Sequence, residues 1–336
     1  MIFLISGLAI VALVMFDFIW TTLSVKGAGP LSSFCSRYLW AVFGAVARRL
    51  DRRWPVLIAG PVVLLSALLG WMFLLWLGWT LVFLASADAL VTSPDHLPTG
   101  FWARVYFVGF TLTTLGIGDI IPDGALWRVL TAASALNGLT VVTMAITYLL
   151  GVLSAVTALR GSAVYISALG TSPSGVLLTG WDGSRFEPLA DHLMALTPSL
   201  HQLSQSMLAY PVLTMFGAER VAAIAPAAVV LDESLTMLEQ GVAPDARLAQ
   251  GRIRPLRNAI DNLIDDMGAD LPRAAAPPPV APSLAALRTA GVPVVDDHAF
   301  EHALALQADR RRRLDAMLQH QAWNWRSVAA QSTNHA

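Results

Sequence analysis

The residues with the clearest chemistry form the stretch Thr111-Leu-Thr-Thr-Leu-Gly-Ile-Gly-Asp119, which lies between two long apolar runs. An ion that leaves water needs oxygen atoms to replace its hydration shell, and rows of backbone carbonyls can supply them. Turning successive carbonyls toward one axis requires alternate residues in a backbone conformation that is costly for a residue with a side chain. Gly116 and Gly118 have the spacing for this. Non-helical backbone is tolerated at membrane depth only where it is buried in protein or lines a water-filled cavity. A stretch with this spacing could line such a cavity with its carbonyls, and it therefore predicts an ion-coordinating loop.

The composition places part of the chain in lipid. With 336 residues, of which 55% are hydrophobic and 13% charged, the chain is too apolar for an ordinary soluble protein of this length. Charges are sparse in residues 1–160 and frequent in residues 161–336, so we expect a membrane half followed by a soluble half. The net charge of -1 gives no reason to expect nucleic acid as a partner, and the single Cys35 cannot form an internal disulfide.

Three apolar runs are long enough to cross a hydrocarbon core, which needs about 20 helical residues. They are residues 1–25, 54–87 and 129–159. A signal peptide is the alternative for the first run, but the absence of a basic residue before Lys26 and of a clear cleavage site favours a retained helix. Residues 100–113 form an apolar segment too short to span, which predicts a re-entrant helix.

Loop charges give the orientation. The segment 26–53 carries six basic residues against one acid, so by the positive-inside tendency it is cytoplasmic and the N-terminus lies outside. Within it, residues 38–50 are either a short helix at the inner membrane interface or a plain connecting loop. Residues 88–100 contain no Lys or Arg and are expected outside. We therefore expect a multi-pass protein of the plasma (inner) membrane with residues 114–119 on its outer side.

The stretch from Thr111 to Asp119, followed by Pro122, resembles the selectivity filter of the potassium channel family, whose usual text is T-x-T-T-V-G-Y-G-D. The resemblance implies an all-α membrane protein with a pore domain at residues 54–160. Its expected parts are an outer helix (54–87), a pore helix (100–113), a filter (114–119) and an inner helix (129–159). One such segment cannot close a pore, so a homotetramer in membrane lipid is expected.

The resemblance also implies roles for individual residues. The ligands of the permeant potassium ions would be Thr114, Leu115, Gly116, Ile117 and Gly118. Thr111 and Thr113 would support the filter, and Asp119 would lie at its outer mouth. Conduction would be passive, with no cofactor and no enzymatic step, and no clustered nucleophile, base and acid suggests otherwise.

Two positions depart from the family pattern. Ile117 replaces the usual Tyr, so it cannot make the hydroxyl hydrogen bond that braces the family's filter. Phe110 stands where some relatives carry an acid that pairs with the filter Asp, so Asp119 needs water, a backbone amide or another partner. A weakly selective cation channel is therefore an alternative, although no acidic residue inside the filter supports it.

The inner helix holds the candidate gate. Gly138 lies mid-span, where the resemblance places a bending glycine, and close helix packing is its alternative role. Leu150 and Leu153 are candidates for a hydrophobic constriction that closes by dewetting. Thr147 and its neighbours can face a wet cavity or bond back to their own helix. Asp17 either pairs with a polar group of a neighbouring helix or reaches water at the interface.

The soluble half predicts a mainly helical cytoplasmic domain at residues 161–271, with an extended piece at 174–178. A Pro/Ala linker (272–283) and a C-terminal helical segment (284–336) follow. No nucleotide-binding motif appears, and the regulatory ligand is unknown. The rival function is a membrane-anchored signalling or assembly protein with a non-conducting pore-like domain.

Two charged clusters in the C-terminal segment are open to a functional reading. His298 and His302 lie four residues apart, and a solvated helix face is favoured over zinc ligation because no Cys or fourth strong ligand is near. Arg310–Arg313 predict an exposed helix surface, with lipid headgroups or an acidic partner as second choices.

Overall fold

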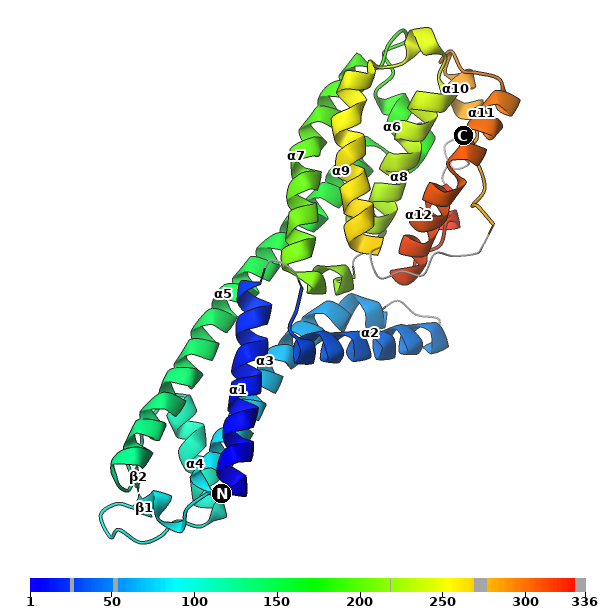
Figure 1. The fold of residues 1–336 in the computed structure, drawn as a ribbon. Coiled ribbons are helices and arrows are strands. Elements are labelled where there is room, and N and C mark those ends of the chain that lie inside the picture. The colour runs from blue at the N-terminus through cyan, green and yellow to red at the C-terminus, as the bar shows by residue number, and fades with distance from the viewer. Residues whose placement is uncertain (25–26, 51–53, 218, 269–276, 330–336) are drawn as a thin grey trace. The chain divides into compact units, whose positions relative to one another are not determined.

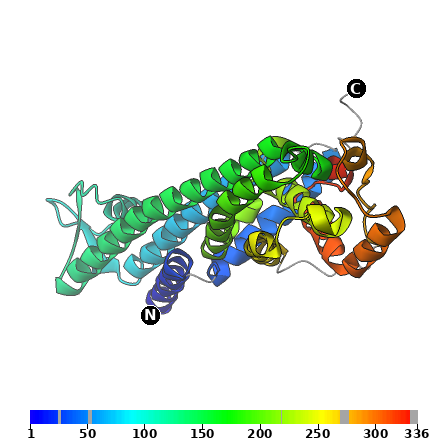
Figure 2. The same cartoon turned by 90° about the horizontal axis from the view of Figure 1, so that it is seen from above.

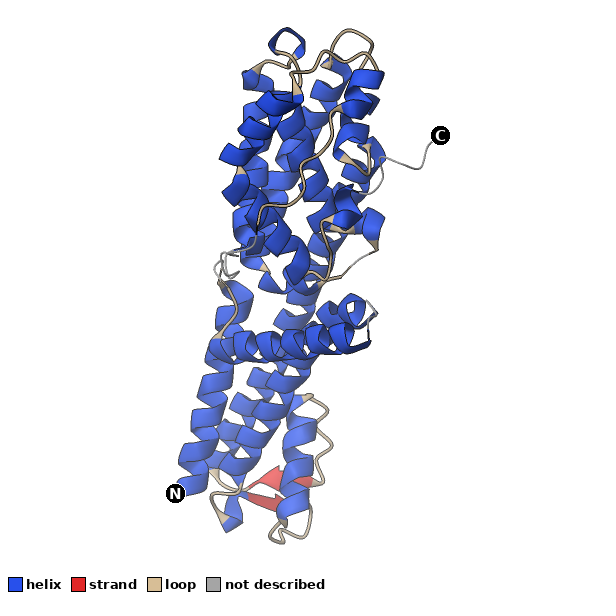
Figure 3. Ribbon diagram, turned by 90° about the vertical axis from the view of Figure 1, so that its right-hand side faces the viewer, coloured by secondary structure: helices blue, strands red, loops and turns tan. Residues whose placement is uncertain are grey.

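The computed structural model describes residues 1–24, 27–50, 54–217, 219–268 and 277–329. It has two compact units. Unit 1 comprises Met1–Val42 and Pro61–Val152, and unit 2 comprises Phe43–Gly60 and Leu153–Ala336. Helices dominate, with one small pair of strands (Figure 3). The predicted all-α membrane fold is therefore confirmed.

Three helices are long and apolar enough to cross a membrane: α1 (Ile2–Leu23), α3 (Trp54–Phe83) and α5 (Ala125–Leu169). Each overlaps one apolar run of the sequence, but α3 ends at Phe83 before residue 87, and α5 extends beyond both ends of the predicted 129–159 helix. Between α1 and α3 lies α2 (Pro30–Leu50), so the helical reading of this segment is correct and the helix begins earlier than residue 38. The short apolar segment forms α4 (Phe101–Leu112) (Figure 1).

Small residues bring α1 and α3 together. A Cβ atom on Gly7 would lie 2.6 Å from the carbonyl oxygen of Gly78, so the two backbones touch at this level. Nearer the other end of α1, the Phe18 ring meets the edge of Trp71 with ring centroids 5.0 Å apart. Because lipid tails are as apolar as the helices, such close packing is what holds spans together. The helix α1 is thus part of the core of unit 1.

A two-stranded antiparallel sheet joins a segment before α4 to the segment that follows the 114–119 loop. The strand β1 (Leu90–Thr92), which comes after the 3₁₀ turn Ala87–Ala89, pairs with β2 (Ile120–Pro122) in the register Val91 opposite Ile121. These strands were not predicted because three residues are too few for a periodic pattern. Their pairing ties the exit of the loop to the segment that follows α3.

Unit 2 is helical throughout its described part. Its longer helices are α7 (Glu187–Ala209), α8 (Ile224–Thr236) and α9 (Gln250–Gly268), and α7 and α9 lie side by side (Figure 1). The leucines of α7 that recur at helical spacing are buried, except for Leu208, which is 40% exposed. The shorter elements are η2 (Pro211–Met215), η3 (Arg220–Ala222), η4 (Met237–Gly241), η5 (Pro244–Ala246), α10 (Ala285–Thr289), α11 (Asp297–Leu306), α12 (Ala308–His320) and α13 (Arg326–Ala329).

The prediction of an extended piece at residues 174–178 is wrong. This segment belongs to α6 (Pro173–Thr179). The Ser172 hydroxyl accepts a hydrogen bond from the Gly175 amide at 3.2 Å, and Pro173 occupies the first turn, where its missing N–H costs nothing. Ser172 and Pro173 thus begin a helix.

Arg310 and Arg311 of α12 correct a second prediction, because both are largely buried, whereas Arg313 of the same run is exposed as predicted. Arg311 has a side chain only 4% exposed and holds Glu233 at 2.8 Å. It also donates to the carbonyl of Val280 at 2.8 Å, which attaches the Pro/Ala segment to α12. Arg310 pairs with Asp232 and Asp261, thereby joining α12 to α8 and α9. A buried charge needs such partners.

The Arg311 pair can be tested by truncation. Replacing Arg311 by alanine leaves the Glu233 carboxylate buried without its partner, which costs roughly 3–5 kcal/mol. We expect the opening free energy of α8 and α12 amides in the full-length protein to fall by this order, measured by hydrogen exchange. Arg313→Ala is the control, because the Arg313–Asp265 pair is solvent-exposed and contributes at most about 1 kcal/mol. Equal effects of the two substitutions would contradict the assignment.

The same variant should respond to pH. Burial raises the pKa of the Glu233 carboxyl, and its hydrogen bonds to Arg311 oppose that rise. Without Arg311, the pKa of Glu233 in the folded protein moves further above its unfolded value of about 4.3. Below about pH 4.3 the carboxyl is protonated in both states and costs no stability. As the pH rises from there through the folded-state pKa, the free energy of unfolding falls. The stability deficit of Arg311→Ala relative to the wild type should therefore widen as the pH rises above the unfolded-state pKa.

Candidate functional site

The start of α4 is anchored by Arg104. Its guanidinium donates to the carbonyls of Phe83 (2.6 Å), Ser86 (2.7 Å) and Ala87 (2.6 Å), and its Nε donates to the carbonyl of Thr99 (3.3 Å). Carbonyls at the end of a helix lack intrahelical partners, and here Arg104 supplies one for Phe83, the last residue of α3, and bonds two carbonyls of the turn that follows. Sequence reasoning assigns Arg104 no role, although a lone arginine in an apolar segment is a visible signal. The residue joins α4 to the end of α3.

The loop that follows α4 has an alternating backbone. Thr114, Gly116 and Gly118 have φ values of 58°, 60° and 87°, so every second residue adopts the left-handed region. A Cβ atom on either glycine would meet nothing within 4 Å in this chain, so glycine is required by conformation and not by space. Leu115 and Ile117 are 68% and 50% exposed. The backbone conformation expected for Gly116 and Gly118 is present.

The threonines before the loop hold its root. Thr111 is only 6% exposed, and its carbonyl accepts the Thr114 amide at 3.0 Å. The Thr113 hydroxyl bonds back to the carbonyl of Gly109 at 3.0 Å, inside the last turn of α4. The Thr114 hydroxyl donates to the Thr113 carbonyl at 2.7 Å. These contacts fix the point at which the chain leaves the helix.

Asp119 finds its partner on α4. Its carboxylate accepts a side-chain hydrogen bond from Tyr106, and the Tyr106 ring meets Phe110 edge-on with centroids 5.1 Å apart. The Asp119 carbonyl accepts the Ser93 amide at 2.9 Å. The partner of Asp119, which the sequence left open, is thus Tyr106. Ile117 takes no part in it.

Gly138 lies where α5 meets the end of α4. A Cβ atom on Gly138 would lie 1.9 Å from the carbonyl oxygen of Leu112, a distance that no side chain can occupy. The helix α5 continues without interruption through this position, from Ala125 to Leu169 (Figure 2). Of the two roles open to Gly138, close packing is the one that these contacts support.

The gate candidates lie further along α5. Leu150 and Leu153 are 63% and 47% exposed in the single chain, so neither belongs to its core. The Thr147 hydroxyl bonds back to the carbonyl of Thr143 at 3.2 Å, which is the local alternative for these threonines. The structure therefore leaves the two leucines available for contacts outside the chain.

Asp17 does not reach water. It is fully buried, and its carboxylate accepts the Leu31 amide at 2.7 Å, the Ser32 hydroxyl at 2.6 Å and the Trp71 indole N–H at 2.9 Å. The Ser32 amide adds a longer bond of 3.3 Å. Of the two accounts open to Asp17, pairing with a neighbouring helix is correct, and the carboxylate joins α1, α2 and α3.

The histidine pair of α11 has no metal-binding surroundings. His298 and His302 are both exposed. Among the residues that the structure describes, no group of three or more His, Cys, Asp or Glu side chains is arranged to hold a metal ion.

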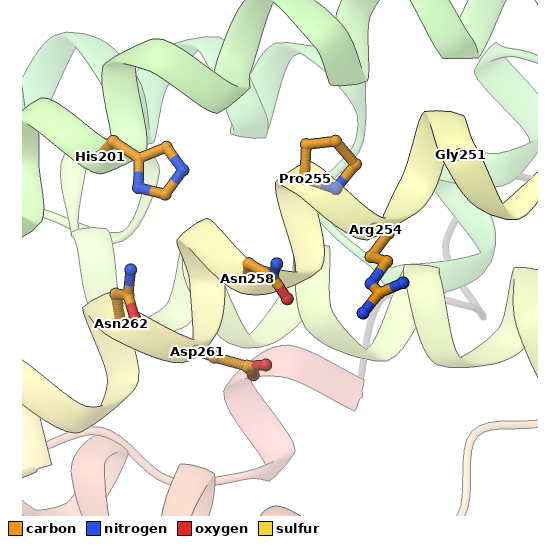
Figure 4. A pocket seen from close by; sticks show the side chains of 7 residues that line it. All are labelled: His201, Gly251, Arg254, Pro255, Asn258, Asp261 and Asn262. Atoms are coloured by element: carbon orange, nitrogen blue, oxygen red, sulfur yellow. The ribbon is translucent and has the colours of Figure 1, made fainter.

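A groove of about 710 Å³ lies on the surface of unit 2 (Figure 4). Its lining residues are His201 from α7 and Gly251, Arg254, Pro255, Asn258, Asp261 and Asn262 from α9. The acid of the groove, Asp261, is already paired with Arg310. The groove is open, its lining mixes polar and apolar surface, and its chemistry singles out no ligand class.

Comparison with known proteins agrees with the geometry of unit 1. Residues 69–155 match a family model described as "Ion channel", and this range includes α4, the 114–119 loop and the first part of α5. The class that fold and site support is therefore an ion channel of the two-transmembrane type, embedded as an integral membrane protein.

A full-length relative extends the comparison. The chain is 30% identical over 325 residues to the "Uncharacterized membrane protein YdjJ" of Bacillus subtilis (strain 168), covering 96% of this chain and 95% of that protein. The chain belongs to the family of that membrane protein. No solved structure matches the chain.

The contact of Gly138 with α4 gives a test. Gly138→Ala forces the Leu112 carbonyl to move, and overpacking of this kind costs roughly 1–3 kcal/mol. We expect a lower thermal midpoint for the purified protein in detergent. The matched control is Gly161→Ala on the same helix, where a Cβ atom meets nothing within 4 Å, and it should leave the midpoint unchanged or higher. A normal midpoint for Gly138→Ala would argue against close packing.

Proposed function

We propose that the chain is one subunit of a homotetrameric potassium channel that conducts ions passively. The observation that carries the proposal is the alternating backbone of the 114–119 loop, with positive φ at Thr114, Gly116 and Gly118. This alternation suits a row of carbonyls that face one axis and replace the hydration shell of potassium. The ion-channel match over residues 69–155 supports it independently. Thr114, Leu115, Gly116, Ile117 and Gly118 would supply the oxygens.

The need for four chains follows from the loop itself. A single chain offers carbonyls from one side only, whereas an ion in a pore requires oxygens all round. The exposure of Leu115 (68%) and Ile117 (50%) leaves apolar side chains that a ring of subunits would cover. A closed cyclic arrangement is the ordinary form of such assemblies.

The remaining path runs along α5. Leu150 and Leu153, exposed in the single chain, would meet their counterparts around the axis and form a constriction that closes by losing its water. Ions would pass in file, and no bond is made or broken. By the loop charges of the sequence, the 114–119 loop would face outside and residues 161–336 the cytoplasm of a plasma-membrane protein.

Selectivity rests on how rigidly the loop is held. Ile117 removes a hydroxyl at the loop, and the Tyr106–Asp119 hydrogen bond supplies a brace from α4 instead. Thr111 and Thr113 secure the root of the loop, and Asp119 its outer end. With these supports we expect potassium to be preferred over sodium.

The proposal is tested by ion flux. Gly116→Ala and Gly118→Ala place a side chain at positive φ, which costs roughly 1–2 kcal/mol in each subunit. Potassium flux through the purified protein in liposomes should fall to background in both, while Gly161→Ala, a substitution in open space, retains it. Flux that survives both loop substitutions would contradict a pore at this loop. Equal sodium and potassium flux in the wild type would favour a weakly selective cation channel.

The brace gives a separate test. Tyr106→Phe removes the hydrogen bond to Asp119 and keeps the ring contact with Phe110. A hydrogen bond to a charged group contributes roughly 1.5–3 kcal/mol, so we expect the potassium-to-sodium permeability ratio to fall by about tenfold or more. Tyr165→Phe, which removes a hydroxyl from unit 2, is the control. An unchanged ratio in Tyr106→Phe would remove the brace from the account.

A further inference from the structure

The helix α2 is held close to the membrane by its neighbours in the chain. Six residues (24–29) separate it from α1, and three (51–53) separate it from α3, both of which are long and apolar enough to span. Because a residue extends the chain by at most about 3.6 Å, the C-terminal end of α2 stays within roughly 15 Å of the start of α3. A helix of 21 residues tethered so tightly at both ends cannot leave the membrane surface.

One face of α2 is apolar and is not covered by the part of the chain that the structure describes. Phe34, Tyr38, Val42 and Val46 recur four residues apart and are 67%, 63%, 41% and 37% exposed. At this spacing they share one side of the helix. Apolar side chains gain free energy on leaving water, so a continuous face of this kind favours burial in an apolar surrounding.

The charge of α2 is wholly positive. The helix contains Arg37, Arg48 and Arg49 and no acidic residue, and Arg37 and Arg49 are exposed. Basic residues beside an apolar face are typical of helices that lie in the interface of a bilayer with anionic lipid. A protein partner for such a face would need acidic side chains, whereas the bilayer is already continuous with α1 and α3.

The buried carboxylate of Asp17 sets the direction of α2. It accepts the Leu31 amide and the Ser32 hydroxyl at the first turn of α2, and it is held from α3 by the Trp71 indole. A Cβ atom on Gly29 would lie 2.3 Å from the Asp17 carboxylate, so the approach is tight. Within unit 1, the first part of α2 runs across the direction of α1 (Figures 1 and 3).

We propose that α2 is a membrane-interface helix. Its face formed by Phe34, Tyr38, Val42 and Val46 enters the boundary between headgroups and acyl chains, and Arg37 and Arg49 bind the headgroups of anionic phospholipids. Asp17 is a positioning residue that fixes this orientation. The inference goes beyond conduction, because it concerns a lipid-binding surface outside the pore and holds whether or not the 114–119 loop passes ions.

The single cysteine gives a direct measurement. Cys35 is exposed and lies next to Phe34 on the same helix, so a nitroxide label can be attached to the otherwise unaltered full-length protein. The measured quantity is the ratio of label collisions with dissolved oxygen to collisions with a water-soluble nickel complex. In phosphatidylcholine vesicles we expect this ratio to be at least twofold higher at Cys35 than at a water-exposed reference site. That reference is Leu306→Cys in a Cys35→Ser background, since Leu306 is 79% exposed in unit 2.

The headgroup contact is tested by lipid charge. Adding about 30% phosphatidylserine should reduce nickel collisions at Cys35 at least twofold further, through attraction of the arginines to the anionic surface. The double variant Arg37→Gln/Arg49→Gln should lose this response and stay accessible to oxygen, whereas Arg313→Gln, on α12 of unit 2, should keep it. Asp17→Asn should broaden the range of label depths.

Three results would overturn the proposal. A Cys35 label as accessible to nickel as the Leu306 reference would place α2 in water. A label shielded from both reagents would indicate a protein partner or a second copy of the chain. A label at membrane depth that ignores phosphatidylserine would remove the headgroup contact. None of these readouts requires ion flux, so they stand apart from the tests of the pore.

Discussion

A backbone carbonyl or amide inside hydrocarbon has no water to bond, and this constraint shapes unit 1. It permits helices, whose backbone bonds are internal, and it makes every interruption of a helix a problem with a specific solution. Where α3 ends, Arg104 donates to the carbonyl of its last residue, Phe83, and to the carbonyls of Ser86 and Ala87 just beyond it. Where α4 ends, the threonines Thr113 and Thr114 bond to the carbonyls of the last turn and the loop. The 114–119 loop is the next interruption, with Gly116 and Gly118 at positive φ and the Asp119 carbonyl bonded to the Ser93 amide at its end.

Much of unit 1 could be predicted, because the information is local. The apolar runs predicted α1, α3 and α5, and the length of the segment before the loop predicted that α4 cannot span. The spacing of Gly116 and Gly118 predicted their backbone conformation, since positive φ is penalised for other residues. The role of Gly138 stayed ambiguous, because the sequence shows that the side chain is absent but not which neighbour packs against that position.

The parts that were missed depend on contacts between distant positions. Arg310 and Asp232 are 78 residues apart, so no local pattern shows that this arginine is paired and largely withdrawn from water. The hydrogen bond from Tyr106 to Asp119 and the pairing of β1 with β2 likewise need the fold before they exist. A charged run was therefore assigned to the surface, which is where unpaired charges belong.

The carboxylate of Asp17 has a consequence for how the protein is made. When α1 enters the membrane, its acid has as partners only the groups near Ser32, and the Trp71 indole is synthesised 54 residues later. A carboxylate within a span is costly unless its hydrogen bonds are complete, so α1 is fully stabilised only when α3 brings the Trp71 indole beside it. Insertion of the first and second spans is thus a coupled event in biogenesis. Asp17 therefore disfavours α1 as an isolated membrane helix and favours it where α2 and α3 supply its hydrogen bonds.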